Sequence, residues 1–550
     1  MSEALNQPPP LAGYNLYTGD RVLGEALRRE GAGWAEDRLR AFGEIAGRPE
    51  ILAQGPLANE NRPVLRTHDR AGNRLDEVDF HPAWHALLGL GVEHGLHALP
   101  WREPGPGAHV ARAALFMILA QVEAGVGCPL SMTYSALPTL RLAPALAAEW
   151  EPRLTSLAYD SRSGPVAGKT GALCGMAMTE KQGGSDVRAN ITAARPLGGG
   201  NGDEYEITGH KWFCSAPQSD AFLVLAQAPG GLSCFLLPRF TPDGRRNRLH
   251  FQRLKDKLGN RSNASSEVEF DAAWARRVGE EGRGVATILE MVGHTRLDCG
   301  LGAAAGLRQG TVQALHHAAH RRAFGRRLIE QPLMRNVLAD LALESEAATV
   351  AILRLARAYD EHAAGSAEAG AFKRLATAVL KYWLCKRAPV HAAEALECLG
   401  GNGYVEEWGM ARLYREAPLN SIWEGSGNIQ CLDVLRALTK TPEALDLFLA
   451  EVDAARGADA RLDEAARALR DGLGRARTGD PAALEGQARR WVERLALALQ
   501  AALLIRAGAP SAVVEGFCAT RLGGEGGRAF GTLPAGIDLE AILDRARPAA

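Results

Sequence analysis

Three long segments with the apolar spacing of helices constrain the fold of this chain more than any other feature. They cover residues 286–323, 332–364 and 371–399, and each is long enough to belong to a helical bundle. Gly300, Gly302 and Gly306 lie within the first segment. No strand precedes these glycines, so we expect them to allow close helix packing and not to form a nucleotide-binding loop.

A different pattern precedes the bundle. Runs of apolar and β-branched residues, typical of strands, occupy residues 205–208, 221–226, 233–237 and 267–270. A stretch rich in Ser, Gly and Pro at 160–171 marks a boundary before them. From about residue 20 to 150 the spacing is again helical, as in Ala108–Ala124.

The order of these patterns predicts a mainly α fold with a central β-domain. We expect an N-terminal helical domain at 1–171, a β-domain at 172–282, a helical bundle at 283–440 and a C-terminal helical extension at 441–550. The extension starts at Thr441-Pro442-Glu443, which we interpret as an N-cap, a proline at the first helical position and an acid in the first turn.

Composition favours a soluble protein of a reducing compartment. The formal net charge is −1 and 46% of residues are hydrophobic, so a DNA-binding surface would have to be local. No apolar run reaches about 18 residues and residues 1–10 contain no charged-then-apolar signal, so we expect neither a membrane span nor secretion.

The nine cysteines include no Cys-x-x-Cys pair and favour reduced thiols in the cytoplasm. His81 and His85 can share one helix face, but no third ligand is apparent, so no metal is expected.

One carboxylate stands out in the segment Asn420–Ile429. Glu424 follows the bulky Ile422 and Trp423 and precedes Gly425. Bulky neighbours would exclude water and raise its pKa toward the range of a general base, while glycine lets a flat ligand approach the backbone. The alternative is a glutamate that the helix dipole favours before a helix N-terminus.

Four further motifs accompany the Glu424 segment: Met178–Asp186, Gly209–Ser215, Arg321–Gly325 and Leu399–Tyr404. Together they resemble the flavin-binding framework of the acyl-CoA dehydrogenase superfamily. The sequences of 179–187, 255–265 and 420–428 resemble its AidB-like branch, which is associated with the bacterial response to DNA alkylation. The resemblance covers nearly the whole chain.

This resemblance implies the superfamily's architecture, a homotetramer and FAD as the cofactor. Carried over residue by residue, the residues that would line the flavin ring are Met178, Thr179, Gly184, Ser185, Phe213, Cys214 and Ser215. Those that would close over the cofactor are Ile422, Trp423, Gly425, Ser426, Gly427 and Asn428. Those that would approach the FAD of a neighbouring subunit are Arg321, Phe324 and Gln331. Each also has a plain alternative as a surface charge, a core aromatic or a turn residue.

The resemblance also implies the chemistry. Glu424 would take a proton from the α-carbon of an acyl-CoA thioester while a hydride leaves the β-carbon for FAD. Some relatives carry the base in a Glu-Arg-Leu sequence that corresponds here to Thr295-Arg296-Leu297, so Glu424 is the candidate. Glu397 stands where relatives commonly have glutamine, and could weaken FAD retention.

Trp423 and Lys181-Gln182 depart from common residues around the acyl pocket, so the substrate is not identified. A short branched acyl-CoA is the default by resemblance to the isovaleryl branch, and an electron-transfer flavoprotein is an expected partner.

The C-terminal extension raises the question of DNA. Residues 441–550 hold 14 arginines, no lysine and 16 acids, so the extension is not net basic. A local cluster contains Arg467, Arg470, Arg475, Arg477, Arg489, Arg490 and Arg494. It fits a solvated surface around an apolar stripe at 495–505. By resemblance to the AidB-like branch it fits equally a site for double-stranded DNA, to which Arg436 and Arg521 would contribute.

We therefore expect an AidB-like FAD flavoprotein that binds and protects DNA and retains weak isovaleryl-CoA-like dehydrogenase activity. The alternatives are a working short- or branched-chain acyl-CoA dehydrogenase without DNA binding, and a scaffold that has lost its chemistry.

Overall fold

The chain folds into two compact units. The computed structural model describes residues 5–198 and 202–548, without the side chains of 476–478. The first, the helical unit, comprises Met1–Leu52, Gly105–Gln121 and Arg296–Ala550, and the second, the barrel unit, comprises Ala53–Pro104 and Val122–Thr295. The expected domain at 1–171 therefore contributes segments to both units.

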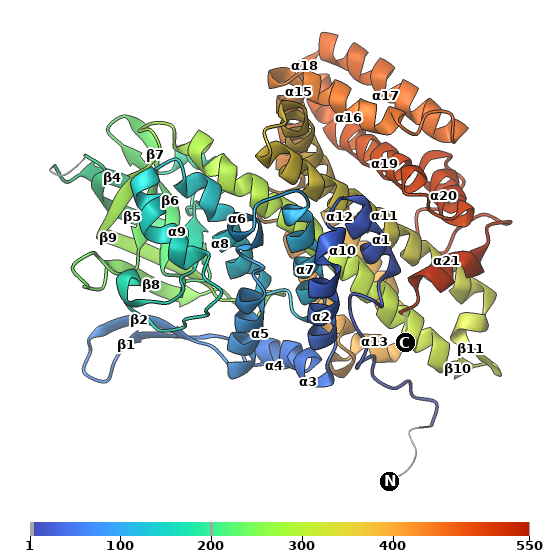
Figure 1. Cartoon of the computed structure of the whole chain (residues 1–550), viewed down its shortest axis with the longest axis horizontal. Coiled ribbons are helices and arrows are strands. Elements are labelled where there is room, and N and C mark those ends of the chain that lie inside the picture. The colour runs from blue at the N-terminus through green and yellow to red at the C-terminus, as the bar shows by residue number, and fades with distance from the viewer. Residues whose placement is uncertain (1–4, 199–201, 549–550) are drawn as a thin grey trace. The chain divides into compact units, whose positions relative to one another are not determined.

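A closed ring of strands forms the core of the barrel unit (Figure 1). The ring consists of β4 (Ala193–Pro196), β5 (Glu204–Ser215), β6 (Ala221–Ala228), β7 (Gly231–Pro238) and β9 (Ser265–Val278). They pair in the order β6, β4, β5, β9 and β7, and β7 pairs back with β6. β3 (Cys174–Ala177) adds to β6, and β8 (Leu249–Leu254) adds to β9. Closure removes most free edges, and apolar side chains such as Phe222, Phe235 and Phe270 fill the interior.

The four predicted strands are found, each longer than expected, whereas β3, β4 and β8 are additional. β3 and β4 are short and rich in Ala, Gly and Cys, so they carry little strand signal. A further hairpin, β1 (Val64–His68) and β2 (Arg74–Asp79), interrupts the segment expected to be helical. Asp69 shapes its turn by accepting hydrogen bonds from the N–H groups of Ala71 and Asn73.

The other elements of the barrel unit are helices. They are α4 (Gln54–Glu60), α5 (Pro82–Glu93), α6 (Leu99–Arg102), α8 (Gly127–Leu140) and α9 (Pro144–Leu154).

Three long helices form the framework of the helical unit: α10 (Gly284–His320, from Arg296 on), α11 (Pro332–Ala363) and α12 (Ala367–Glu397). The expectation of close packing at the α10 glycines is confirmed at its first two positions. A Cβ atom on Gly300 would lie 2.6 Å from Ile352 Cδ1 of α11, and one on Gly302 would lie 3.1 Å from Asn420 Nδ2.

Shorter helices complete the part of the helical unit that precedes the extension. They are α1 (Arg21–Arg29), α2 (Glu36–Ala46), α3 (Pro49–Leu52), α7 (Ala108–Val122), α13 (Gly401–Tyr404), α14 (Met410–Glu416) and α15 (Gly427–Lys440). Helix α7 belongs here because Asp360 of α11 accepts hydrogen bonds from the N–H groups of His109 and Val110, at 2.7 and 3.2 Å.

The C-terminal extension is part of the helical unit. Its helices are α16 (Glu443–Asp453), α17 (Ala460–Thr478), α18 (Pro481–Gly486), α19 (Ala488–Arg506), α20 (Ser511–Phe517) and α21 (Leu539–Ala546). Helix α16 begins at Glu443, one residue later than expected, because Thr441 still caps the end of α15. Helix α19 contacts α11, α12 and α15, and apolar residues of the 495–505 stripe such as Leu495 and Leu499 are buried.

Two arginines near the C-terminus bind buried carboxylates of α11. Arg521 Nη2 lies 2.5 Å from Asp340 Oδ1 and 3.2 Å from Glu344 Oε2. Arg545 Nε lies 2.7 Å from Glu346 Oε1. Burial would raise the pKa of Glu344, but the charges of Arg387 and Arg521 outweigh it and lower this pKa to about 2.

We predict that Arg521→Ala lowers the free energy of unfolding by about 3 kcal/mol, because it removes the main partner of Asp340 and one partner of Glu344. Urea denaturation of the full chain measures this change. Arg467→Ala is the control, because Arg467 pairs with Glu464 at the surface and its loss should cost less than about 1 kcal/mol. Equal effects of the two substitutions would contradict a structural role for Arg521.

Candidate functional site

Hydrogen bonds of the buried Glu180 hold the Met178–Asp186 motif in place. Lys211 Nζ of β5 donates to Glu180 Oε1 at 2.7 Å, and both side chains are fully buried. The second oxygen of Glu180 accepts from the N–H of Ile191 at 2.8 Å and from Gln182 Nε2 at 2.7 Å. Glu180 therefore fixes the loop from which Met178, Thr179 and Ser185 project.

Glu180 is ionised at neutral pH. Burial raises its pKa, but hydrogen bonds from Lys211, Ile191 and Thr192 outweigh burial and lower it to about 2. Burial in turn lowers the pKa of Lys211 to about 8, although Glu180 opposes this change. Sequence reasoning missed this pair, although a lysine beside apolar residues in a strand was a signal for it.

Two of the expected flavin motifs meet in the barrel unit. The N–H of Trp212 donates to the carbonyl of Thr179 at 2.8 Å, which joins the loop to β5. A Cβ atom on Gly184 would lie 3.0 Å from the Thr179 side chain, so glycine permits the tight turn. Thr179 is half-buried and Gly184 is exposed.

The remaining barrel residues of the expected flavin site differ in exposure. Phe213 is 47% exposed, whereas Cys214 is buried in the barrel core, so a ligand could not reach its thiol. Ser215 Oγ lies 3.3 Å from Ser265 Oγ. Met178 is half-buried and Ser185 is exposed.

A cationic and aromatic surface adjoins these motifs. Lys255 Nζ lies 3.3 Å from the ring centroid of Trp212 and 4.7 Å from that of Phe213. Lys181 and Arg253 also approach Trp212, at 5.6 and 5.8 Å. Glu267 pairs with both Lys255 and Arg253, at 2.6 and 2.7 Å, so the positive charge of this edge of the barrel unit is partly neutralised.

In the helical unit, Glu424 has an unusual backbone conformation. Its φ is +59°, and that of Gly425 is +96°. A non-glycine residue in this left-handed region costs about 1 to 2 kcal/mol. Lys381 Nζ donates to the carbonyls of Trp423 and Gly425, at 2.8 and 2.6 Å. The turn is therefore strained, and hydrogen bonds to the residues before and after Glu424 hold it.

A second set of donors binds the carbonyl of Glu424 itself. Arg296 Nε and Gln430 Nε2 both lie 3.0 Å from it. Asp433 orients Arg296 by accepting from its Nη1 at 2.7 Å, and also accepts from Arg374 Nη2 at 2.6 Å. Burial raises the pKa of Asp433, but these two arginines outweigh it and lower it. Sequence reasoning missed this network because its members are distant in the chain.

The N-terminus of α15 follows this turn and fits an anionic group of a cofactor. Ser426 occupies the N-cap without a side-chain capping hydrogen bond. A Cβ atom on Gly427 would lie 2.8 Å from Lys386 Cε, so glycine admits this lysine beside the helix start. Arg489 Nε of the extension donates to Asn428 Oδ1 at 2.8 Å. The N–H groups of a first helical turn with nearby cations fit a diphosphate such as that of FAD.

The Glu424 segment otherwise lies near the surface of the helical unit. Ile422 is exposed, and Trp423 is half-buried with its Nε1 donating to Asn420 Oδ1 at 2.9 Å. A Cβ atom on Gly425 would lie 2.8 Å from Gln430 Nε2, so only glycine fits. Glu424 precedes the N-cap of α15 by two residues.

A small hairpin carries the residues expected to reach a neighbouring subunit. Strands β10 (Arg322–Ala323) and β11 (Arg326–Arg327) pair around Phe324, whose φ is +51° and whose side chain is 98% exposed. Arg321 Nη1 donates to the carbonyl of Asn6 at 2.7 Å, and Gln331 Nε2 to that of Ala323 at 3.2 Å. Arg321 and Gln331 thus hold the hairpin that presents Phe324.

The arginines considered for DNA differ in availability. Arg521 is half-buried, with 14% of its side chain exposed, and pairs with Asp340 and Glu344 of α11, so less of its charge is available to DNA. Arg436 is 59% exposed and contacts Asp433 at 3.2 Å. Arg467 and Arg470 pair with carboxylates, while the side chain of Arg477 lies outside the described residues. Arg489, Arg490 and Arg494 are exposed on α19.

His81 and His85 make structural hydrogen bonds, and the cysteines are buried. His81 caps α5 by accepting from the N–H of Ala83, and His85 Nδ1 lies 2.7 Å from the Tyr159 hydroxyl. All nine cysteines are free and buried. Across residues 5–198 and 202–548, no helix combines the length and apolar character needed to cross a membrane.

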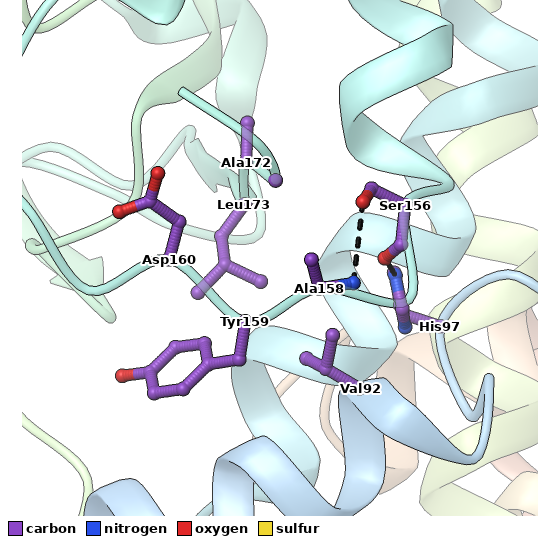
Figure 2. A pocket seen from close by; sticks show the side chains of 9 residues that line it. Val92, His97, Ser156, Ala158, Tyr159, Asp160, Ala172 and Leu173 are labelled. Atoms are coloured by element: carbon purple, nitrogen blue, oxygen red, sulfur yellow. Dashed lines mark hydrogen bonds between the residues drawn. The ribbon is translucent and has the colours of Figure 1, made fainter. Parts of the chain in front are cut away.

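Figure 2 shows a small pocket of the barrel unit that none of the expected site residues lines. His97 Nε2 lies 3.0 Å from the carbonyl of Ser156, whose hydroxyl accepts from the N–H of Ala158 at 3.2 Å. Tyr159, also in its lining, bonds to His85. Asp160 of the lining pairs with Arg162 outside it, so these contacts are structural and the pocket is assigned no function.

Comparison with known proteins identifies the family. The adaptive response protein AidB N-terminal domain matches residues 6–161, and the acyl-CoA dehydrogenase middle and C-terminal domains match 175–273 and 282–439. The AidB protein of Escherichia coli (strain K12) is 52% identical over 470 residues, which cover 85% of this chain and 86% of the relative. Acyl-CoA dehydrogenase family member 11 of Caenorhabditis elegans is 32% identical over 472 residues, covering 82% and 75%.

The solved structures agree. Caenorhabditis elegans ACDH-11 in complex with C11-CoA matches with a TM-score of 0.86 and 27% identity, covering 100% of this chain and 94% of that chain. The chain belongs to the AidB branch of the acyl-CoA dehydrogenase family. It is an FAD-dependent oxidoreductase of the acyl-CoA dehydrogenase type, and the predicted fold class is confirmed.

We predict that Glu180→Gln lowers the free energy of unfolding by about 3 kcal/mol at pH 7, because it leaves the Lys211 ammonium buried without its carboxylate. The folded pKa of Glu180 is about 2 and its ordinary value 4.5. Its contribution is therefore complete above pH 4.5 and lost as the pH falls toward 2. Urea denaturation across this range should show a steeper acid loss for the wild type than for the variant.

Glu206→Gln is the matched control for Glu180→Gln. Glu206 pairs with the exposed Arg195 on the same barrel, so its loss should cost less than about 1 kcal/mol. Parallel pH curves for the wild type and Glu180→Gln would show that the buried pair does not stabilise the barrel.

Proposed function

We propose that this protein oxidises acyl-CoA thioesters with Glu424 as the general base. The single observation that carries the proposal is the Glu424 turn. A carboxylate in strained left-handed backbone, with the carbonyls on both sides bound by a buried lysine, is fixed in direction at a structural cost. Such strain is typical of catalytic positions.

The residues around Glu424 fit removal of a proton from carbon. The half-buried carboxylate accepts the α-proton of the thioester, and partial exclusion of water favours a base of sufficient strength. Arg296 and Gln430 hold the Glu424 carbonyl, so the carboxylate remains directed while the proton moves. Thr295 stands at the alternative base position and cannot take this role.

The residues that we propose for the cofactor are those carried over from the family: the loop with Thr179 and Ser185, the Phe213–Ser215 segment and the start of α15. FAD, when bound, accepts the hydride that leaves the β-carbon. An electron-transfer flavoprotein is the proposed electron acceptor.

We propose that assembly into a homotetramer buries the exposed β10–β11 hairpin. Phe324 is almost fully exposed on a turn that needs positive φ at a non-glycine residue. A large apolar ring in this position suits burial against a second copy of the chain. We propose that Phe324, Arg321 and Gln331 act at this interface, beside the FAD of a neighbouring subunit.

The acyl group is the least defined part of the substrate. The structure of the Caenorhabditis elegans relative was solved in complex with C11-CoA. For this chain, the resemblance to the isovaleryl branch favours a short branched acyl-CoA such as isovaleryl-CoA. Because Glu267 already binds Arg253 and Lys255, Lys181 beside Trp212 is the cation that we propose for the phosphates of coenzyme A with either substrate.

A second function, binding of double-stranded DNA in the adaptive response to alkylation in the cytoplasm, is favoured by one observation. Residues 6–161 match the N-terminal domain of the adaptive response protein AidB. The surface proposed for DNA is the exposed row Arg489, Arg490 and Arg494 of α19, with Arg436 of α15 as a further candidate. The non-basic composition of the extension limits this site to a local patch.

We predict that Glu424→Gln retains FAD but lowers the rate of flavin reduction by acyl-CoA by about 1,000-fold, the range expected for loss of a general base. Anaerobic stopped-flow absorbance measures this rate. Glu443→Gln, an exposed substitution in the first turn of α16, should reduce flavin at the wild-type rate. Wild-type reduction rates in Glu424→Gln would exclude Glu424 as the base.

For DNA, we predict that the full chain binds a duplex and that affinity falls with salt. The double substitution Arg490→Ala and Arg494→Ala should weaken binding and reduce the slope of log affinity against log salt by about 2. Fluorescence anisotropy at salt concentrations from roughly 50 to 200 mM measures this affinity and its slope. Arg467→Ala, which removes an arginine already paired with Glu464, is the control.

Unchanged binding in the double variant would exclude the α19 row. We avoid deletion of residues 441–550, because the extension packs against α11 and α12 and its removal would expose their apolar surface.

A further inference from the structure

A buried lysine in the helical unit has no carboxylate partner. Lys381 lies in the middle of α12, and its side chain is fully buried. Among the described residues, no carboxylate lies within ion-pairing distance of its Nζ atom. An ammonium group removed from water without an opposite charge is unfavourable. Its presence therefore indicates that the interactions it does make are needed.

The hydrogen bonds of Lys381 lie on both sides of Glu424 in the chain. The Nζ atom donates to the carbonyl of Trp423 at 2.8 Å and to that of Gly425 at 2.6 Å. These carbonyls precede and follow Glu424, so one cation can bind both only if the chain reverses at Glu424. The φ of +59° at Glu424 is that reversal. Hydrogen bonds to a charged donor are stronger than neutral ones and can offset the backbone strain.

The charges of Lys381 and Glu424 act on the same neighbouring group. Burial raises the pKa of the Cys299 thiol, the charge of Lys381 opposes this rise, and Glu424 adds to it. Both charges therefore act on the same thiol of α10. The Cys385 thiol of α12 lies in the same environment, and the charge of Lys381 opposes the effect of burial on its pKa as well.

Two other cations at the turn share a single carboxylate. Arg296 of α10 and Arg374 of α12 both bind Asp433 of α15. Lys381 differs from these arginines because, among the described residues, its ammonium group binds main-chain carbonyls and no carboxylate. A positive charge of this kind favours the ionised form of a nearby carboxylate.

We propose that Lys381 is the positioning residue of the Glu424 turn: its ammonium group fixes the carbonyls on both sides of Glu424 and supplies the positive charge that favours the carboxylate form of the base. The proposal rests on the proposed role of Glu424, but its effect on the backbone can be tested without turnover.

Hydrogen exchange provides the test that does not require catalysis. Lys381→Met keeps the length and apolar stem of the side chain but removes the donor. We expect amide exchange in the peptide spanning 420–430 to become at least about tenfold faster in the FAD-loaded, full-length variant. Lys373→Met, in the same helix and against the ring of Tyr359, should leave exchange in this peptide unchanged. Wild-type exchange in Lys381→Met would overturn the proposal.

Reduction kinetics test the consequence for the base. With FAD content equal to that of the wild type, Lys381→Met should lower the maximal rate of flavin reduction by about 100-fold while the dissociation constant of the acyl-CoA changes less than about threefold. Loss of the positive charge should also raise the apparent pKa of the reduction step. A slower rate with an unshifted pH profile would overturn the electrostatic part, because it would reflect general loss of structure.

A second variant separates hydrogen bonding from charge. Lys381→Gln retains N–H donors without charge, so we expect slower exchange than in Lys381→Met with the same rise in apparent pKa. It also provides the test if Lys381→Met does not fold. If no acyl-CoA reduces the wild type, the proposed function fails, whereas the exchange experiment still decides whether Lys381 fixes the turn.

Discussion

The binding of main-chain carbonyl oxygens by two cationic side chains is the interaction on which the candidate active site depends. Lys381 and Arg296 between them bind the carbonyls of three consecutive residues, Trp423 to Gly425. Without these donors, Glu424 would relax from its left-handed conformation, because L-residues disfavour positive φ. The direction of the proposed base is thus set by side chains of α10 and α12, the long helices that form the framework of the helical unit.

The C-terminal extension is tied to the same framework. Its helix α19 packs on α11, α12 and α15, Arg521 binds carboxylates of α11, and Arg489 contacts Asn428 beside the candidate active site. The extension therefore stabilises the helical unit and contacts the start of α15. A surface for DNA on α19 would lie on a helix that already has this structural role.

Sequence reasoning predicted the general order of helices and strands, the close packing at Gly300 and Gly302 and the segments of the family framework, because these depend on local periodicity and on short motifs. The grouping of these segments into two compact units could not be predicted in the same way. Helix α7 joins the helical unit through Asp360, a contact across about 250 residues. Likewise Glu180 with Lys211, and Lys381 with the Glu424 turn, pair residues whose chemistry is visible only after folding.

The measurement that tests the central claim most directly is an anaerobic titration of the flavin-loaded wild-type protein with acyl-CoAs of graded chain length and branching, followed by the visible band of oxidised flavin. A working site with Glu424 as base predicts near-stoichiometric bleaching by at least one thioester. Retention of the oxidised band with every thioester, while FAD remains bound, would contradict it and leave the Glu424 turn as a structural feature without this chemistry.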